Sequence, residues 1–293
     1  MGVLLLKSLL YGVIEGVTEW LPVSSTGHLI LLDEVLTLNV GAQVHPQFAA
    51  EFRELFLVAI QLGAILAVLT TYYTRLLAPL TRQATRKSAL AVWARVAVGC
   101  IPAGLAGVAA DAVCERLCGK DMDGLLYNGA VVAAMLMLYG VLFIVVECVR
   151  KGKDTDGVCE VGHLTYTQCL GVGLFQVLSL IPGTSRSGAC MLGGMLLGLS
   201  RRCAAELSFF MAVPIMLGAC GIKALGFARF MWQNSLAMPF SALAVLLVAG
   251  AVAYVTSRLT IRFLIDFISR RGFAPFGVYR MLLGAAVLCY FIL

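Results

Sequence analysis

Charged residues are scarce in this chain. Of its 293 residues, 13% are Asp, Glu, Lys or Arg and 60% are hydrophobic, and the mean hydropathy is +0.93. Soluble domains carry roughly 25% charged residues. With about half that charge density, the chain has too few charged residues to form a water-exposed surface. The composition therefore excludes a soluble cytosolic enzyme and indicates an integral membrane protein.

Proline is also rare, and the cysteines form no motif. Only eight prolines occur, and the ten cysteines are scattered without a C-x-x-C pair. This composition excludes collagen-like chains, disordered chains and disulfide scaffolds. The formal net charge of +6 is expected to lie in loops that orient the chain in the bilayer. We do not expect a nucleic-acid partner.

Long hydrophobic runs are what the sequence does contain. A helix needs about 20 apolar residues to cross a bilayer. Six stretches qualify: 55–73, 89–110, 125–148, 204–227, 238–256 and 274–293. Two further apolar regions, 3–32 and 165–199, are interrupted near their middle by residues 22–27 and 182–188. Each half of these regions is too short to span, so we predict two re-entrant helical hairpins.

The distribution of basic residues favours these hairpins over straight crossings. If both hairpins return to the side they left, one side receives loops 75–88, 149–163 and 258–272 together with Arg201 and Arg202. That side then carries 13 Lys and Arg, against four on the other side. An excess of basic residues marks the cytoplasmic side. The prediction is an all-α membrane protein with six transmembrane helices and both termini outside.

The two halves of the chain share a pattern. Gly12-Val-Ile-Glu15 … Pro22-Val-Ser-Ser25 runs parallel to Gly173-Leu-Phe-Gln176 … Pro182-Gly-Thr-Ser185. In the predicted topology the first hairpin enters from outside and the second from inside. We therefore predict one polytopic domain over residues 1–293, built from inverted-topology repeats at about 1–148 and 164–293. Such repeats place a polar site where broken helices meet, near the midplane.

Ionisable side chains in the first hairpin are candidates for this site, because each costs roughly 2.5–3.5 kcal/mol at the bilayer centre. Glu15 and Glu19 are four residues apart and share a helix face. They are either interfacial carboxylates or a divalent-cation or acid/base pair. His28 is a candidate general acid or base. The hydroxyls of Ser24, Ser25 and Thr26 precede it at a predicted helix start, where they can cap free amides and where anions bind.

The second hairpin supplies an anion-binding sequence, Pro182-Gly-Thr-Ser-Arg-Ser-Gly188, ahead of a predicted helix at 189–199. Gly183 permits close backbone approach, and Arg186 offers a planar fork that suits phosphate oxygens. The hydroxyls here belong to Thr184, Ser185 and Ser187. A snorkelling arginine fits poorly at this place, whereas Arg95 and Arg280, inside other spans, are expected to reach towards the cytoplasm.

Together the two hairpins predict a phosphate group held between two helix N-termini. Phosphoryl chemistry needs charge neutralisation, a nucleophile and a proton acceptor. Ser25 or a bound water could attack, and Glu19 or His28 could take the proton. The residues leave these alternatives open.

The stretches Glu15-Gly-Val-Thr-Glu19-Trp-Leu-Pro-Val-Ser-Ser-Thr-Gly-His28 and Pro182–Gly188 resemble the two signatures of the undecaprenyl-diphosphate phosphatases, or bacitracin-resistance proteins. The resemblance covers essentially the whole chain. It implies a multi-pass enzyme of the bacterial plasma membrane that removes the terminal phosphate of undecaprenyl diphosphate. The product is the lipid carrier of cell-wall synthesis, and the site is expected to face outside.

The resemblance also implies roles for particular residues. Catalytic positions carry over to Glu15, Glu19, Ser25, His28 and Arg186, with Ser24, Thr26, Ser185 and Ser187 nearby. The family uses Mg²⁺ or Ca²⁺, which suits the Glu15/Glu19 pair because hard cations prefer oxygen ligands. One departure is Cys190, where the family usually has threonine. A thiol is a weak hydrogen bonder, yet we expect activity to persist.

A transporter or flippase of an anionic polyprenyl lipid is the competing interpretation. Inverted repeats with midplane charges are typical of secondary transporters. A pure carrier needs neither a nucleophile nor a base, so the carboxylates, histidine and hydroxyls favour an enzyme. Whether the protein is a monomer or a homodimer is left open.

Overall fold

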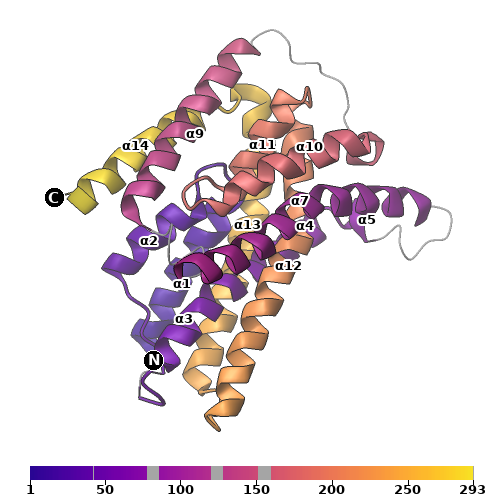
Figure 1. Cartoon of the computed structure of the whole chain (residues 1–293). Coiled ribbons are helices and arrows are strands. Elements are labelled where there is room, and N and C mark those ends of the chain that lie inside the picture. Colours follow the sequence, from indigo (N-terminus) through magenta and orange to yellow (C-terminus); the bar gives the residue numbers. More distant parts are fainter. Residues whose placement is uncertain (42, 78–85, 120–127, 151–159, 293) are drawn as a thin grey trace.

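The computed structural model describes residues 1–41, 43–77, 86–119, 128–150 and 160–292, and every regular element in these ranges is a helix (Figure 1). In chain order they are α1 (Gly2–Thr18), α2 (Ser25–Val35), α3 (Phe48–Ala59), α4 (Gln61–Thr71), α5 (Tyr73–Leu76), α7 (Arg86–Cys118), α9 (Gly129–Val149), η1 (Val161–His163), α10 (Tyr166–Val177), η2 (Leu178–Leu180), α11 (Arg186–Leu196), α12 (Arg201–Gln233), α13 (Phe240–Arg271) and α14 (Ala274–Ile292).

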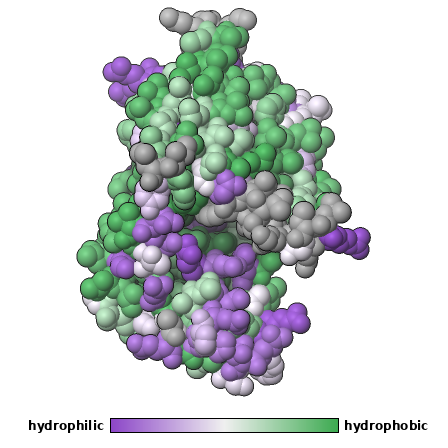
Figure 2. Space-filling model, turned by 60° about the vertical axis from the view of Figure 1, so that its left-hand side comes forward, coloured by the Kyte–Doolittle hydropathy of each residue, from purple (hydrophilic) through white to green (hydrophobic). Residues whose placement is uncertain are grey.

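Six helical segments of the described chain are long and apolar enough to cross a membrane. They are Phe48–Thr71, Lys87–Cys114, Gly129–Val149, Arg201–Gln233, Phe240–Arg271 and Ala274–Phe291. Each overlaps one predicted span, so the prediction of six apolar spans is confirmed. Figure 2 shows broad hydrophobic areas on one face, with hydrophilic residues gathered towards its lower end. The chain is thus a multi-pass membrane protein.

The two interrupted regions form pairs of short helices, α1 with α2 and α10 with α11, as their central breaks predicted. The second helix of the later pair begins at Arg186 rather than at residue 189. It begins earlier because the Ser185 hydroxyl accepts a hydrogen bond from the Gly188 backbone N–H and caps the helix there.

One predicted loop is helical. Residues 258–271 continue α13, and the helix ends only at Gly272, whose φ of 68° favours glycine. Ile261, Leu264 and Ile268 are buried at helical spacing along this segment, so packing sustains the helix although arginines interrupt the apolar run. Hydropathy marks where apolar character ends, which is not where a helix must end. The other two predicted cytoplasmic loops lie partly outside the described residues.

Small residues let the helices approach closely. A Cβ atom at Gly12 of α1 would lie 2.5 Å from the carbonyl oxygen of Ala249 in α13. Likewise, α9 and α14 lie side by side, and a Cβ at Gly140 would come within 2.8 Å of the Gly277 oxygen (Figure 1). Close packing of small residues is the usual means of holding helices together in lipid.

The turns that open α2 and α11 have the same local structure. Ser24 and Ser185 both have a positive φ, 71° and 72°, and both cap the following helix. Their hydroxyls accept from the backbone N–H three residues on, at Gly27 and Gly188. The geometry therefore pairs Ser24 with Ser185, whereas the sequence comparison placed Ser25 opposite Ser185.

Arg280 does not extend to the cytoplasm as predicted but is fully buried in α14. Its Nη1 donates to the Pro22 carbonyl at 3.0 Å, and its Nη2 lies 2.8 Å and 3.0 Å from the carbonyls of Gly183 and Thr184. Longer contacts of 3.4–3.5 Å reach two carbonyls of α9. A single side chain thus joins the turns of both helix pairs to α9 and α14.

We expect Arg280→Met to lower the free energy of unfolding by at least about 2 kcal/mol, because buried carbonyls in both turns lose their donors. Thermal unfolding in detergent measures the change. Arg270→Met, at an exposed position of α13, is the matched control and should unfold close to wild type. Equal stability of the two variants would show that the turns do not depend on Arg280.

Candidate active site

The Glu19 carboxylate is the meeting point of the two helix pairs. Glu19 follows the last turn of α1, and its Oε2 accepts a hydrogen bond of 2.7 Å from the Ser25 hydroxyl. Its Oε1 lies 3.1 Å from Nη2 of Arg186, with both side chains about one-tenth exposed. The structure therefore brings a hydroxyl, a carboxylate and a guanidinium from the predicted set into direct contact.

Ser187 fixes this arrangement through the backbone. Its hydroxyl lies 3.0 Å from the carbonyl oxygen of Glu19 and 3.2 Å from that of Leu21. The Ser185 hydroxyl lies 3.1 Å from the same Ser187 oxygen. These bonds join the N-terminus of α11 to the end of α1, so the two serines link the two helix pairs.

Glu15 is fully buried one turn before Glu19. Neither of its carboxylate oxygens has a hydrogen-bond partner among the described residues. The same holds for the Thr184 hydroxyl and for Nε of Arg186, which are also buried. Buried polar groups are nearly always satisfied, so this part of the protein has free acceptors and donors ready for a ligand, a cation or water.

Arg186 is held in place by more than Glu19. Its Nη1 donates to the Ser208 carbonyl of α12 at 2.9 Å, and its guanidinium carbon lies 6.0 Å from the centre of the Trp20 ring. The side chain is therefore fixed on three sides while Nε–H is left free. This is not a snorkelling arginine, since its guanidinium is buried where the two helix pairs meet.

His28 belongs to the same helix start, but its ring nitrogens contact Ser24 and Tyr279 rather than Ser25 or Glu19. Its Nδ1 lies 2.8 Å from the Ser24 carbonyl oxygen, and its Nε2 lies 2.6 Å from the hydroxyl of Tyr279. Tyr279 and its neighbour Arg280 were missed as site residues. The sequence marked Arg280 only as a charged residue inside a predicted span and gave no signal for Tyr279.

The remaining predicted binding residues have structural roles in the turns. Ser24 caps α2, and Thr26 is half-buried in its first turn. Gly183 has a φ of 91° and packs against α9, where a Cβ would lie 2.6 Å from the Val132 oxygen. Its carbonyl accepts from Arg280.

Cys190 lies one turn beyond Arg186 and is fully buried. Its thiol sulfur is 3.4 Å from Oε1 of Gln176. Gln176 corresponds to Glu15 in the pattern shared by the two halves, and its Nε2 has no partner among the described residues. The thiol thus orients a buried amide.

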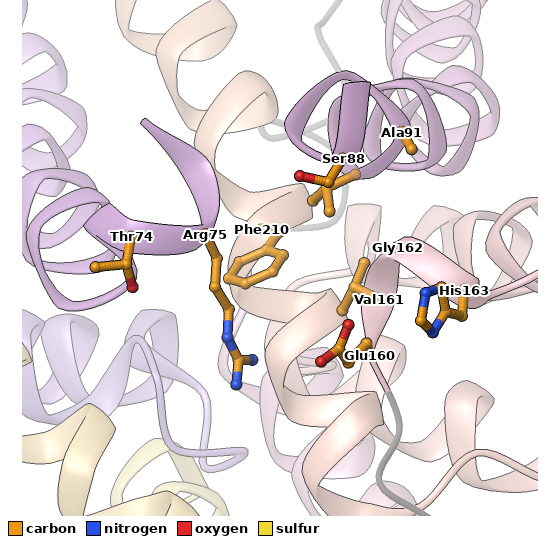
Figure 3. A pocket seen from close by; sticks show the side chains of 10 residues that line it. Thr74, Arg75, Ser88, Ala91, Glu160, Val161, Gly162, His163 and Phe210 are labelled. Atoms are coloured by element: carbon orange, nitrogen blue, oxygen red, sulfur yellow. The ribbon is translucent and has the colours of Figure 1, made fainter. Parts of the chain in front are cut away.

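A cavity of about 290 Å³ lies elsewhere, between α5, α7, η1 and α12 (Figure 3). Its lining includes the charged or polar side chains of Arg75, Glu160 and His163, and the ring of Phe210. Arg75 donates to the buried Glu206 at 2.6 Å. None of the predicted site residues lines this cavity. Because its lining carries both positive and negative side chains, its charge does not indicate which kind of ligand it would bind.

The fold and the Ser25–Glu19–Arg186 contacts define a polytopic membrane protein with the groups of a hydrolytic enzyme. The family described as "Bacitracin resistance protein BacA" matches residues 8–286. A relative from Desulfitobacterium hafniense, named undecaprenyl-diphosphatase, is 43% identical over 97% of this chain and 95% of its own length. One from Enterococcus faecalis with the same name is 42% identical, covering 97% and 96%. The chain belongs to this bacitracin-resistance family.

Gly183→Ala should destabilise the protein because the added Cβ meets the Val132 backbone in a conformation that also strains it. We expect a loss of about 2–4 kcal/mol in unfolding free energy, combining left-handed strain with overpacking. The control is Gly198→Ala, where φ is 86° but no atom lies within 4 Å. It should lose only the strain contribution, about 1–2 kcal/mol. Equal melting temperatures of the two variants would contradict this explanation of Gly183.

Proposed function

We propose that this protein hydrolyses undecaprenyl diphosphate to undecaprenyl phosphate and inorganic phosphate, with Ser25, Glu19 and Arg186 as its catalytic residues. The observation that carries the assignment is the 2.7 Å hydrogen bond from the Ser25 hydroxyl to Glu19. The relatives' printed name, undecaprenyl-diphosphatase, supplies the substrate and the reaction. Recycling of this lipid underlies the bacitracin resistance in the family's description.

The contact between Ser25 and Glu19 supports covalent catalysis. The Ser25 oxygen attacks the terminal phosphorus while its proton passes to Glu19 Oε2, which already accepts it in a hydrogen bond. The bond between that phosphorus and the bridging oxygen breaks, and undecaprenyl phosphate leaves with the proton that Glu19 has taken. Water then attacks the phosphoserine and gives a proton to Glu19, the bond from phosphorus to the Ser25 oxygen breaks, and Glu19 returns the proton to Ser25 as inorganic phosphate is released. Both nitrogens of His28 are engaged elsewhere, so the geometry favours Glu19 over His28 as the proton acceptor.

Arg186 is placed to neutralise the phosphate oxygens during this transfer. Its free Nε–H is a buried donor without an acceptor among the described residues. The N-termini of α2 and α11 begin at Ser25 and Arg186, so both helix dipoles support an anion at the junction. A carrier would need the positive charge but not a hydroxyl hydrogen-bonded to a carboxylate, and the Ser25–Glu19 bond therefore favours hydrolysis over transport.

Glu15 and Glu19 are the residues that would hold Mg²⁺ or Ca²⁺. The fit rests on Glu15, whose buried oxygens have no partner in the described chain, and on the all-oxygen donor set that hard cations prefer. A bound cation would neutralise charge on the diphosphate.

We also assign the two short-helix pairs as re-entrant hairpins of an inverted repeat, with the site open to the outer face of the bacterial plasma membrane. The matched caps at Ser24 and Ser185 and the excess of basic residues on one side support this topology. A cysteine-accessibility experiment with membrane-impermeant reagent at residue 235 would test it, since labelling from inside only would reverse the orientation.

Phosphate release from a polyprenyl diphosphate by purified protein in detergent tests the catalytic assignment. Glu19→Gln and Arg186→Ala should each lower turnover at least about 100-fold, the scale of losing one transition-state contact. Ser25→Ala should fall as far. Ser269→Ala, an exposed hydroxyl of α13 bonded only to its own helix, is the control and should match wild type. Substantial turnover by Ser25→Ala would assign the attack to water instead.

Cation binding has a readout that does not need turnover. Saturating Mg²⁺ or Ca²⁺ at about 100 times its Kd should stabilise the wild type by about 2.7 kcal/mol. Glu15→Gln should lose this stabilisation, and in EDTA it should unfold at a temperature at least as high as wild type because the unpartnered carboxylate is gone. Glu54→Gln changes an exposed acid and should keep the cation-dependent shift. An unchanged shift in Glu15→Gln would exclude Glu15 as a ligand.

A further inference from the structure

Tyr279 of α14 contacts the first hairpin from 251 positions away in the sequence. Its hydroxyl lies 2.6 Å from Nε2 of His28, the two rings are within 4° of parallel, and their centres are 5.7 Å apart. The tyrosine is 44% exposed. It is therefore at the edge of the site rather than in the packed core.

The partners of His28 determine which of its nitrogens carries hydrogen. Nδ1 lies 2.8 Å from the Ser24 carbonyl oxygen, and a carbonyl can only accept. Nδ1 must therefore be the donor, and in the neutral ring Nε2 must accept. The Tyr279 hydroxyl is then the donor to Nε2.

This pair of bonds leads to the peptide that carries the nucleophile. The Ser24 carbonyl belongs to the peptide bond between Ser24 and Ser25. Ser24 has a φ of 71°, a conformation that costs a non-glycine residue about 1–3 kcal/mol unless its surroundings enforce it. On the other side of Ser24, the Pro22 carbonyl accepts from Arg280. Two consecutive residues of α14 thus hold the strained turn before and after Ser24.

We propose that Tyr279 is a positioning residue for the phosphatase reaction, a role that rests on the proposed function of Ser25. Its hydroxyl fixes His28 in the tautomer with hydrogen on Nδ1, and His28 in turn fixes the Ser24–Ser25 peptide so that the Ser25 hydroxyl stays on Glu19. Tyr279 acts through His28 and does not touch the reacting atoms.

The substitution Tyr279→Phe removes the hydroxyl and keeps the ring. We expect turnover to fall about five- to tenfold, the effect of one hydrogen bond, with KM within about twofold of wild type and an unchanged melting temperature. Tyr290→Phe changes a tyrosine of the same helix that is 52% exposed and contacts Phe291 through its ring. It is the matched control and should behave as wild type.

A double-mutant cycle separates positioning through His28 from any other role. In a His28→Ala background, Tyr279→Phe should cause no further loss of turnover. A further loss of the same size there would overturn the proposal, and so would wild-type turnover in the single variant. Either result leaves the nucleophile assignment standing, because Ser25→Ala tests it separately in the same assay. If Ser25→Ala is active while Tyr279→Phe is impaired, the serine assignment fails and so does the proposal.

Discussion

The buried guanidinium of Arg280 is the constraint on which both halves of the site depend. Two chain turns within a membrane protein expose carbonyl groups that no helix satisfies, and hydrocarbon offers no water to replace the missing donors. Arg280 supplies those donors to Pro22 in one turn and to Gly183 and Thr184 in the other. Removing a guanidinium from water costs several kcal/mol. The cost is offset because the planar group is surrounded by carbonyl acceptors on several sides.

The turns that Arg280 holds contain strained residues, and these residues place Ser25 and Arg186 at the helix starts. Ser24 and Ser185 have positive φ values, and in each case the next residue, Ser25 or Arg186, begins a helix. Ser25 and Arg186 therefore reach the two carboxylate oxygens of Glu19. They are held there by the capping hydroxyls, by the carbonyls bound to Arg280 and by the contacts of Ser187 with α1.

The sequence was sufficient to predict the six apolar spans and the residues that meet at Glu19, because lipid penalises charge and makes Glu19 and Arg186 conspicuous. It was not sufficient to predict the contacts that Arg280 makes with the turns or that Tyr279 makes with His28. Arg280 binds backbone carbonyls, which carry no residue identity, and the partners of both residues lie far away along the chain. The end of α13 was misplaced for a related reason, since packing by Ile261 and Ile268 continues where hydropathy stops. Local sequence patterns predict helices and the positions of buried charges. Contacts between residues far apart in the sequence can be identified only once the fold is known.

The two halves of the site are alike in backbone and different in charge. Glu15 and Gln176 occupy corresponding places in α1 and α10 and are both buried, yet Gln176 is neutral and accepts from the Cys190 thiol. A second buried carboxylate in place of Gln176 would add a negative charge in surroundings of low polarity, where repulsion between like charges is magnified. The second helix pair instead contributes Arg186. The first helix pair thus supplies the hydroxyl and the carboxylates and the second supplies the guanidinium, so the charged cluster at Glu19 forms only where the two pairs meet.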